Sequence, residues 1–313
     1  MLVRRKTLCA IGVTCQAAPV HHLHIRFLRF SAFYSPLLLT MSAGHLAAEG
    51  IEATYDVVGP GRTIADGVRD GSVHVAQSAT AVSFEPWTRG EVAPFRHFAL
   101  LNRRDGFFLA RRGPRRPFEW NHLEGSVVVA DHFFQPMAML RCALAERGVE
   151  VPRVTMLDVG QPADIEGAFR DGAGDFVHMQ GPAPQQLEVE GLAHVVASVG
   201  EAAWPIAFSS LCASPEWLGT EEARAFVRAF GAAKQQARSE QPRRVAELVA
   251  QFLPGAHLDA IEAAVTEYQR MGTWEGGTSI DPDLYAQTVH LFQRYGGLAG
   301  NPAYSEVVAA LPD

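Results

Sequence analysis

The 313-residue sequence is poor in lysine: among its 27 basic side chains, only Lys6 and Lys234 are lysines, and all the others are arginines. With 34 acidic residues, the formal net charge is −7. A phosphate backbone requires a basic protein surface, so this balance argues against nucleic acid as the main partner. We therefore expect no nucleic-acid partner.

Cysteine is also scarce, and long apolar runs are missing. The four cysteines are Cys9, Cys15, Cys142 and Cys212, and they form neither a CxxC motif nor a metal-ligand spacing. This pattern favours buried free thiols over a zinc site or a disulfide framework. No segment approaches the roughly 18 uninterrupted apolar residues of a membrane-spanning helix, so we expect no such helix.

The N-terminus has a basic start but only a weak export signal. Its apolar run, from Leu8 to Val13, is shorter than the ~7–15 residues of an export signal core. The residues before Cys15 fit a lipoprotein signal poorly. A weak signal peptide, an uncleaved disordered tail and a start codon placed too early are equal alternatives for residues 1–22.

The rest of the chain has the composition of a globular protein, with 48% apolar and 19% charged residues. Strand-like segments at 24–30, 51–59 and 72–78 are separated by helical patterns. The first helix is expected to begin near Pro36 and to end near Gly50. Alternating strands and helices predict an α/β fold with mainly parallel sheets flanked by helices.

One phrase occurs twice. VRDGSVHVAQS at Val68–Ser78 and FRDGAGDFVHMQG at Phe169–Gly181 both read as a helix that stops at Arg-Asp-Gly and is followed by a short strand. Glycine supplies the left-handed residue that ends each helix. Because the units before and after the phrase also correspond, we predict two similar lobes.

Two interruptions of apolar runs are interpreted as crossings between these lobes. The polar stretch Asn102–Gly106 separates two strand-like runs, and Trp204 and Pro205 separate two more. The predicted organisation is therefore discontinuous. Lobe one comprises 23–104 and 206–313, and lobe two comprises 105–205, with a ligand cleft between them.

The loops at strand ends are the expected binding site, because open parallel sheets bind ligands at the carboxyl ends of their strands. These loops combine polar and aromatic groups, as small-molecule sites do, and lead into helix N-termini that favour anions. The predicted ligand-binding residues are Phe33, Tyr34, Gln77, Ser78, Asn102, Asp131, His132, Phe133, His178, Gln180, Glu201 and Trp204.

No catalytic residue and no metal ligand is assigned. The sequence has no HExxH motif, no nucleophile elbow and no Ser-His-Asp order. The loop Gly59–Thr63 contains glycines but lacks both the dinucleotide fingerprint and the phosphate-loop lysine.

Three segments together resemble a known family. They are Ala32–Tyr55, the GRT and GVRDGSVHVAQS motifs that follow it, and Glu267–Val308 near the end. In this order they are similar to the solute-binding proteins of ABC importers for sulfonates, taurine and related organic anions. That superfamily also includes binding proteins for thiamine-pyrimidine precursors and the eukaryotic enzyme that makes the thiamine pyrimidine. The resemblance extends from about Ile25 to the end of the chain.

The resemblance implies a two-lobed type 2 periplasmic-binding fold whose lobes close on a ligand. It implies a monomer that binds a small organic solute, anionic or (hetero)aromatic, for delivery to an ABC permease. The implied location is periplasmic, although the weak leader leaves a cytoplasmic location open.

An alternative is an enzyme, biosynthetic or sensor protein on the same scaffold, because fold does not determine function. It would act on a pyrimidine-like or aromatic-acid substrate through His132, His178 or Glu201. The resemblance to the eukaryotic synthase would imply a cysteine-rich iron motif and a lysine that holds pyridoxal phosphate. This sequence has no such cysteine run, and neither Lys6 nor Lys234 lies at a predicted strand end. We therefore expect no cofactor and favour binding over catalysis.

Overall fold

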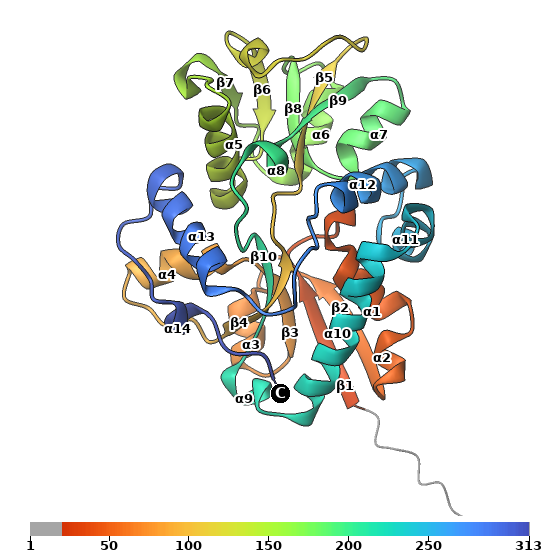
Figure 1. The fold of residues 1–313 in the computed structure, drawn as a ribbon, viewed down its shortest axis with the longest axis vertical. Helices are drawn as coiled ribbons and strands as arrows, with labels where there is room; N and C mark the ends of the chain where they lie inside the picture. Colours follow the sequence, from red (N-terminus) through yellow and green to blue (C-terminus); the bar gives the residue numbers. More distant parts are fainter. Residues whose placement is uncertain (1–20, 313) are drawn as a thin grey trace, which may run out of the picture.

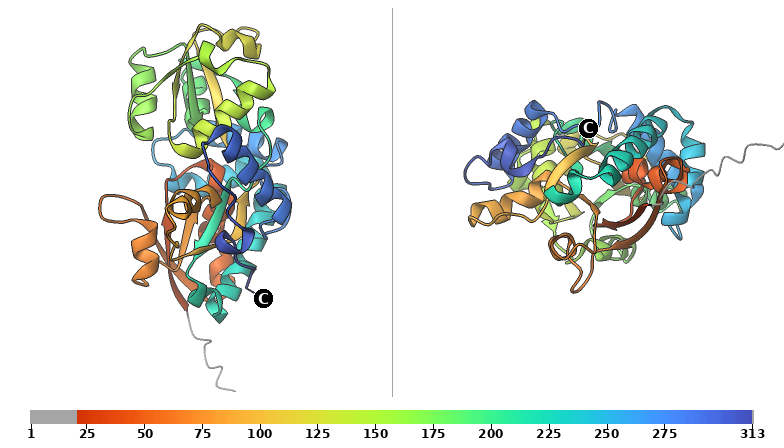
Figure 2. Two further views of the ribbon diagram at one scale, coloured as in Figure 1. Left: turned by 90° about the vertical axis from the view of Figure 1, so that its left-hand side faces the viewer. Right: turned by 90° about the horizontal axis from the view of Figure 1, so that it is seen from below.

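The computed structural model describes residues 21–312, which form two five-stranded sheets arranged one above the other and flanked by helices (Figure 1). The left-hand view of Figure 2, turned by 90°, shows the same two sheets one above the other with helices around them. The expected leader, Lys6, Cys9 and Cys15 lie outside the described residues. The α/β fold class predicted from the sequence is confirmed.

The first sheet contains the strands from both ends of the chain. Its order is β2 (Ile51–Val57), β1 (His21–Phe27), β3 (Val75–Ser78), β10 (Ser209–Ala213) and β4 (Arg96–Asn102). Strand β1 pairs in parallel with β2 from His21 onward, and the His21 amide donates to the Gly50 carbonyl over 2.9 Å. The predicted tail of residues 1–22 was therefore too long, because His21 and His22 are already strand residues.

The second sheet repeats this arrangement. Its order is β7 (Thr155–Leu157), β6 (Val127–Ala130), β8 (Phe176–Gln180), β5 (Phe107–Arg112) and β9 (Ala193–Ser198). In each sheet, one strand is antiparallel to its neighbours: β10 in the first and β5 in the second. The chain reaches β5 directly from the first sheet, and it reaches β10 directly from the second. They begin at the edge where the parallel strands end, so they must run the opposite way.

Helices cover both sheets. Around the first sheet these are α1 (Ser35–Ser42), α2 (His45–Ala48), α3 (Ile64–Arg69), α4 (Phe84–Thr88), α9 (Pro215–Leu218), α10 (Glu221–Ser239), α11 (Pro242–Val249), α12 (Leu258–Arg270), α13 (Pro282–Tyr295) and α14 (Tyr304–Val307). Around the second sheet they are α5 (Phe134–Glu146), α6 (Pro162–Arg170), α7 (Ala183–Val189) and α8 (Val199–Ala202). Short 3-10 turns are η1 (Ala32–Tyr34), η2 (Thr80–Ser83), η3 (Trp120–Leu123), η4 (Val151–Arg153) and η5 (Ala250–Phe252).

The helix predicted between Pro36 and Gly50 is in fact two helices. Pro36 lies in the first turn of α1, as expected, but the chain breaks at Gly44 and resumes as α2. Gly44 has a φ of +84°, a left-handed conformation that ends α1. The apolar periodicity continues through this break, so periodicity alone could not locate it.

The duplicated phrase occupies equivalent places in the two sheets. In the first copy α3 leads into β3, and in the second α6 leads into β8. Each of these strands lies between a parallel strand and the antiparallel strand of its sheet. Gly71 and Gly172 both adopt positive φ, at +77° and +105°. The repeat therefore reflects one supersecondary unit used twice.

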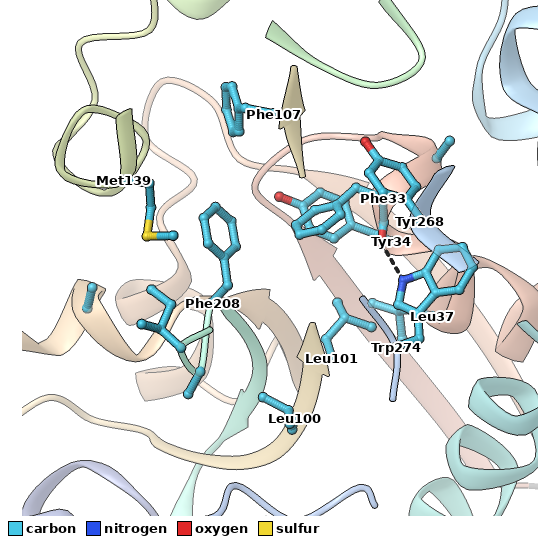
Figure 3. Close-up of a cluster of buried hydrophobic side chains, with 14 of the residues drawn as sticks. Phe33, Tyr34, Leu37, Leu100, Leu101, Phe107, Met139, Phe208, Tyr268 and Trp274 are labelled. Carbon is cyan, nitrogen blue, oxygen red and sulfur yellow. Dashed lines mark hydrogen bonds between the residues drawn. The ribbon is translucent and has the colours of Figure 1, made fainter. Parts of the chain in front are cut away.

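The chain passes between the sheets at residues 103–106 and returns at residues 199–208. Around these crossings a continuous apolar cluster joins both halves, and Figure 3 shows part of it. Gly106 lies so close to the ring of Phe33 that a β-carbon would sit 2.3 Å from it. The Trp274 indole donates to the Phe33 carbonyl over 3.0 Å. The hydroxyl of Tyr268 donates to the Gly106 carbonyl over 2.8 Å.

Candidate functional site

A cleft of about 820 Å³ lies where the two sheets face each other. The carboxyl ends of β1, β3, β6 and β8 reach it, as do the amino ends of β5 and β10. This placement follows from the strand directions described above. The volume lies within the ~300–1,000 Å³ typical of small-molecule sites. Aromatic rings are prominent in its walls: Phe30, Tyr34, Phe107, Phe133, Phe134 and Phe208.

Half of the residues predicted from the sequence line this cleft. They share one feature, a position in the last residues of a strand or in the segment that follows one. They are Tyr34, Gln77, Asp131, Phe133, His178 and Gln180. The structure therefore brings together side chains from both sheets that lie up to about 150 residues apart in sequence.

Phe33, Ser78 and Asn102 do not line the cleft. All three are completely buried. The Phe33 ring packs into the apolar cluster against Tyr34 and Tyr268, with ring centres 5.2 Å apart in both pairs (Figure 3). For Phe33 and Ser78 the strand-end rule identified the right loop but not which of two neighbouring residues faces the cleft, whereas no residue of 102–106 lines it.

His132, Glu201 and Trp204 also lie outside the cleft. The Nδ1 atom of His132 bonds the carbonyl of Ala130, two residues earlier, over 2.9 Å. Glu201 receives two hydrogen bonds from Arg270, at 2.7 and 2.8 Å, and this pairing holds the pKa of its carboxyl below the usual range.

Trp204 lies on the second crossing and packs against α13. Its ring stacks on that of His290, with ring centres 5.5 Å apart and planes only 2° from parallel. The guanidinium of Arg294 lies 6.0 Å from the Trp204 ring centre. This tryptophan therefore attaches the crossing to a helix rather than facing the cleft.

Arg29 and Asp131 form an ion pair across the cleft. Arg29 follows β1 in the first half, and Asp131 follows β6 in the second. An Arg29 Nη1 donates to Oδ2 of Asp131 over 3.2 Å, while Oδ1 accepts from the Phe133 amide over 2.9 Å. Arg29 was missed in the sequence because its partner is 102 residues away. A basic residue at the end of a predicted strand was the available signal.

Two glutamines contribute to the cleft in different ways. In Gln77, Oε1 accepts from the Leu28 amide over 3.1 Å, so this side chain anchors its own loop. Gln180 reaches across to the first half, where its Nε2 donates to the hydroxyl of Tyr34 over 3.4 Å.

His178 lies in the floor of the cleft and is completely buried. It stacks on Phe107, with ring centres 4.7 Å apart and planes 29° from parallel. Burial lowers the pKa of this imidazole to about 3, and the nearby His132 acts in the same direction. At neutral pH the ring is therefore uncharged, with one nitrogen as donor and the other as acceptor.

Gln135 lines the cleft from the first turn of α5. Its Nε2 donates to the carbonyl of Phe208 over 2.7 Å, which links α5 to the residue before β10. In the sequence, Gln135 lies in the strand-end loop 131–135 and at the start of a helix, but it was not among the predicted ligand-binding residues.

Asp105 lies on the first crossing and is completely buried. One of its oxygens accepts from the Phe107 amide. Burial raises the pKa of this carboxyl to about 8, so it is largely protonated at neutral pH. Among residues 21–312, no cluster of three or more histidine, cysteine or acidic side chains could hold a metal ion. Within the same range, no helix is long and apolar enough to cross a membrane.

The sequence matches no family model. A Bacillus subtilis protein named "Putative binding protein YtlA" is 22% identical over 284 residues, covering 89% of this chain and 84% of its own length.

Solved structures of similar fold include a ligand-binding component of an ABC-type import system from Staphylococcus aureus with zinc bound. Its TM-score is 0.72 and its identity 14%, over 93% of this chain and 97% of that one. The alkanesulfonate-binding protein SsuA of Xanthomonas axonopodis pv. citri, bound to MOPS, has a TM-score of 0.68 and 15% identity, over 94% and 100%. The aliphatic sulphonate-binding protein SsuA of Escherichia coli has a TM-score of 0.67 and 17% identity, over 92% of each chain. The chain thus has the two-sheet α/β fold of these periplasmic binding proteins.

Proposed function

We propose that the protein binds a small organic solute in the cleft and presents it to the permease of an ABC-type importer. The observation that carries this proposal is the cleft itself, to which both sheets contribute polar side chains: Gln77 from the first, and Asp131, His178 and Gln180 from the second. The proteins of similar structure are described as ligand-binding components of import systems, which supports the same function.

The cleft is expected to open and close about the two crossings. In this proposal, lobe one comprises 23–104 and 206–313, and lobe two comprises 105–205. Contacts between lobes, such as the pair formed by Arg29 and Asp131, favour the closed arrangement. Because a ligand shifts such an equilibrium only through contacts that differ between the two states, a solute touching both lobes favours closure. We further propose that the protein acts as a monomer in the periplasm.

Catalysis has less support than binding. Of the three residues considered as catalytic candidates, only His178 lines the cleft, whereas His132 and Glu201 lie outside it. His178 is moreover a weak base, since burial lowers its pKa to about 3. A general base works best when its pKa is near the operating pH.

A thermal-shift screen of small organic compounds tests this proposal, combined with small-angle scattering and mass spectrometry of any hit. A cleft solute at a hundredfold excess over its Kd stabilises the folded protein by about 2.7 kcal/mol. Closure also reduces the radius of gyration. Steady conversion of the hit into a product would contradict the proposal, as would stabilisation by no compound of a broad solute panel.

A further inference from the structure

The crossings between the two halves are flanked on both sides by helices that contact the other half. On one side α12 packs against α7, and on the other α13 packs against α5 (Figure 1). At the second of these contacts the rings of Phe134 and Phe292 meet, with ring centres 4.7 Å apart. The two crossings run side by side, because the Ile206 amide donates to the Arg103 carbonyl over 3.1 Å. A rotation of one half against the other disturbs these contacts least if its axis runs through them.

Tyr268 in α12 binds the backbone of a crossing and of the second half at the same time. Its side chain is completely buried. Its hydroxyl donates to the Gly106 carbonyl over 2.8 Å and accepts from the Gly181 amide over 2.9 Å. Gly106 lies on the first crossing, and Gly181 directly follows β8 in the second sheet. One hydroxyl group of the first half thus joins two separate backbone segments.

These two segments form the end of a ladder between neighbouring strands. Strands β5 and β8 are antiparallel, and their register pairs Phe107 with Gln180, the residues next to Gly106 and Gly181. The Gly181 amide also donates to the Gly106 carbonyl over 3.4 Å. Tyr268 therefore holds the second sheet at the point where the chain enters it from the first crossing.

The backbone of Gly181 is bound on both sides by the first half. Its amide donates to Tyr268, and its carbonyl accepts from the hydroxyl of Ser31, which follows β1. A β-carbon at residue 181 would lie 2.6 Å from the Tyr268 hydroxyl oxygen, and one at residue 106 would overlap the Phe33 ring. Glycine at both positions is what allows the first half to approach so closely.

The pair of Arg29 and Asp131 across the cleft is a different kind of contact. One Arg29 nitrogen donates over 3.2 Å, and the Arg29 side chain is 33% exposed. Such a partly solvated pair breaks and re-forms easily, because water that enters an opening cleft can solvate both charges. Breaking the Tyr268 bonds is costly, because it removes a partner from buried backbone groups. The contact across the cleft can therefore open while the Tyr268 bonds persist.

We propose that Tyr268 is the pivot about which the cleft opens and closes. Its two hydrogen bonds persist in the open and closed states and restrict the rotation to one axis. This axis runs from the contact of α12 with α7, through the crossings, to the contact of α13 with α5. Tyr268 does not line the cleft, so it is a positioning residue that acts through the backbone of Gly106 and Gly181. The inference rests on the proposed function, which requires the two halves to move.

Double electron–electron resonance between two nitroxide labels across the cleft tests this pivot without any solute. The labels are attached at Val82→Cys and Ala163→Cys, two exposed positions that line the cleft from the first and the second half. The two N-terminal cysteines are replaced by serine, whereas Cys142 and Cys212 are buried and stay in place. The measured quantity is the width of the distribution of distances between the labels.

Tyr268→Phe removes the pivot hydroxyl and keeps the ring. The distance distribution is expected to become about twice as wide as in the labelled wild-type protein, because the halves can then rotate about more than one axis. The matched control Tyr285→Phe removes another buried hydroxyl, which donates to the Pro302 carbonyl over 3.0 Å within the first half. This control should also lose stability in urea titration, but it should keep the wild-type width. Equal widening in the two variants would show a general loss of packing and would overturn the pivot.

Ser31→Ala removes the other bond of the first half to Gly181 and should widen the distribution in the same direction. A wild-type width in Tyr268→Phe, or in Ser31→Ala where the first variant does not fold, would overturn the inference. The proposed binding function is tested separately, by whether a compound of the solute panel shifts the mean distance in the labelled wild-type protein. If none does while Tyr268→Phe widens the distribution, the pivot stands and the binding function fails.

Discussion

Two histidines, one in each half of the molecule, differ in what surrounds them. His97 in β4 and His178 in β8 are both completely buried, and burial lowers the pKa of each to about 3. His97 is bonded at both nitrogens, to Ser83 at 3.0 Å and to Ser210 at 2.8 Å. His178 has no partner among residues 21–312.

This difference separates a histidine with a structural role from one whose hydrogen-bonding capacity is unused within the described residues. The bonds of His97 join β4, β10 and the turn before α4, so this histidine stabilises the first sheet and its surroundings. Burial of the two ring nitrogens of His178 costs desolvation free energy, and no hydrogen bond within residues 21–312 offsets this cost. In the proposed function, a residue of this kind is expected to contact the bound solute.

Replacing His97 is expected to have the largest effect on stability. His97→Phe removes both bonds and leaves the hydroxyls of Ser83 and Ser210 buried without that partner. A loss of about 3 kcal/mol in the free energy of unfolding is expected, since each unbonded buried group costs roughly 1–3 kcal/mol. Urea titration measures this change. If the variant is as stable as the wild-type protein, the two bonds of His97 do not stabilise the fold, and the two histidines do not differ in the way described.

Acid should destabilise the protein partly through His178. Its folded pKa of about 3 lies below the ordinary value of 6.5, so between these pH values the unfolded chain binds a proton that the folded protein does not. Stability is therefore lost as the pH falls below about 6.5, by up to ~1.4 kcal/mol per pH unit. His178→Phe should reduce this loss of stability at acidic pH by up to ~1.4 kcal/mol per pH unit. Urea titrations at pH 6.5 and 4.5 measure the change. An unchanged dependence on pH would show that His178 is not buried in solution.

Asp105 at the first crossing should show the opposite dependence. Its folded pKa of about 8 lies above the ordinary value of 3.8, so the folded protein holds a proton that the unfolded chain releases. This contribution is fully present at low pH and is lost as the pH rises toward 8. Asp105→Asn keeps the shape and an acceptor for the Phe107 amide, and should raise stability more at pH 8 than at pH 5. Thermal melts at pH 5 and pH 8 test this, and a loss of stability at pH 8 would contradict it.

At neutral pH, His178→Phe should change the free energy of unfolding less than the other two substitutions of buried residues, His97→Phe and Asp105→Asn. The ring can still stack on Phe107, and no internal bond of the described protein is lost. Stability should stay the same or rise by about 1 kcal/mol, because a buried unbonded group is removed. A drop comparable to that of His97→Phe, seen in the same urea titrations, would mean that His178 has a structural partner after all.

Replacing Glu201 is expected to have little effect on stability or on solute binding. It pairs with Arg270 on the surface and does not line the cleft. Exposed ion pairs contribute little, so Glu201→Gln should cost less than about 1 kcal/mol and leave solute affinity unchanged. A clear loss of affinity in calorimetry would place this residue in the site, as the sequence predicted.

Much of the fold could be predicted from the sequence because it depends on local patterns. Alternating strands and helices identified the α/β class, and the Arg-Asp-Gly phrase located β3 and β8. The antiparallel course of β5 and β10 was not predicted, because it follows from the path between sheets rather than from local preference.

Only some of the residues that line the cleft could be predicted from the sequence. The strand-end rule found Tyr34 and Asp131, but it also named Phe33 and His132, their neighbours. Whether a side chain faces the cleft depends on the conformation of a short turn, which the residue type does not determine. The partners of Arg29 and Gln135 lie more than 70 residues away in sequence, so local patterns placed both residues near strand ends but could not reveal these contacts.

Native mass spectrometry of the protein purified from its own host is the sharpest test of solute binding in the cleft. We expect one small molecule per chain on the wild-type protein and on His97→Phe, and none on His178→Phe. Equal loading of His178→Phe, or a bound mass that changes to that of a product during incubation, would contradict it.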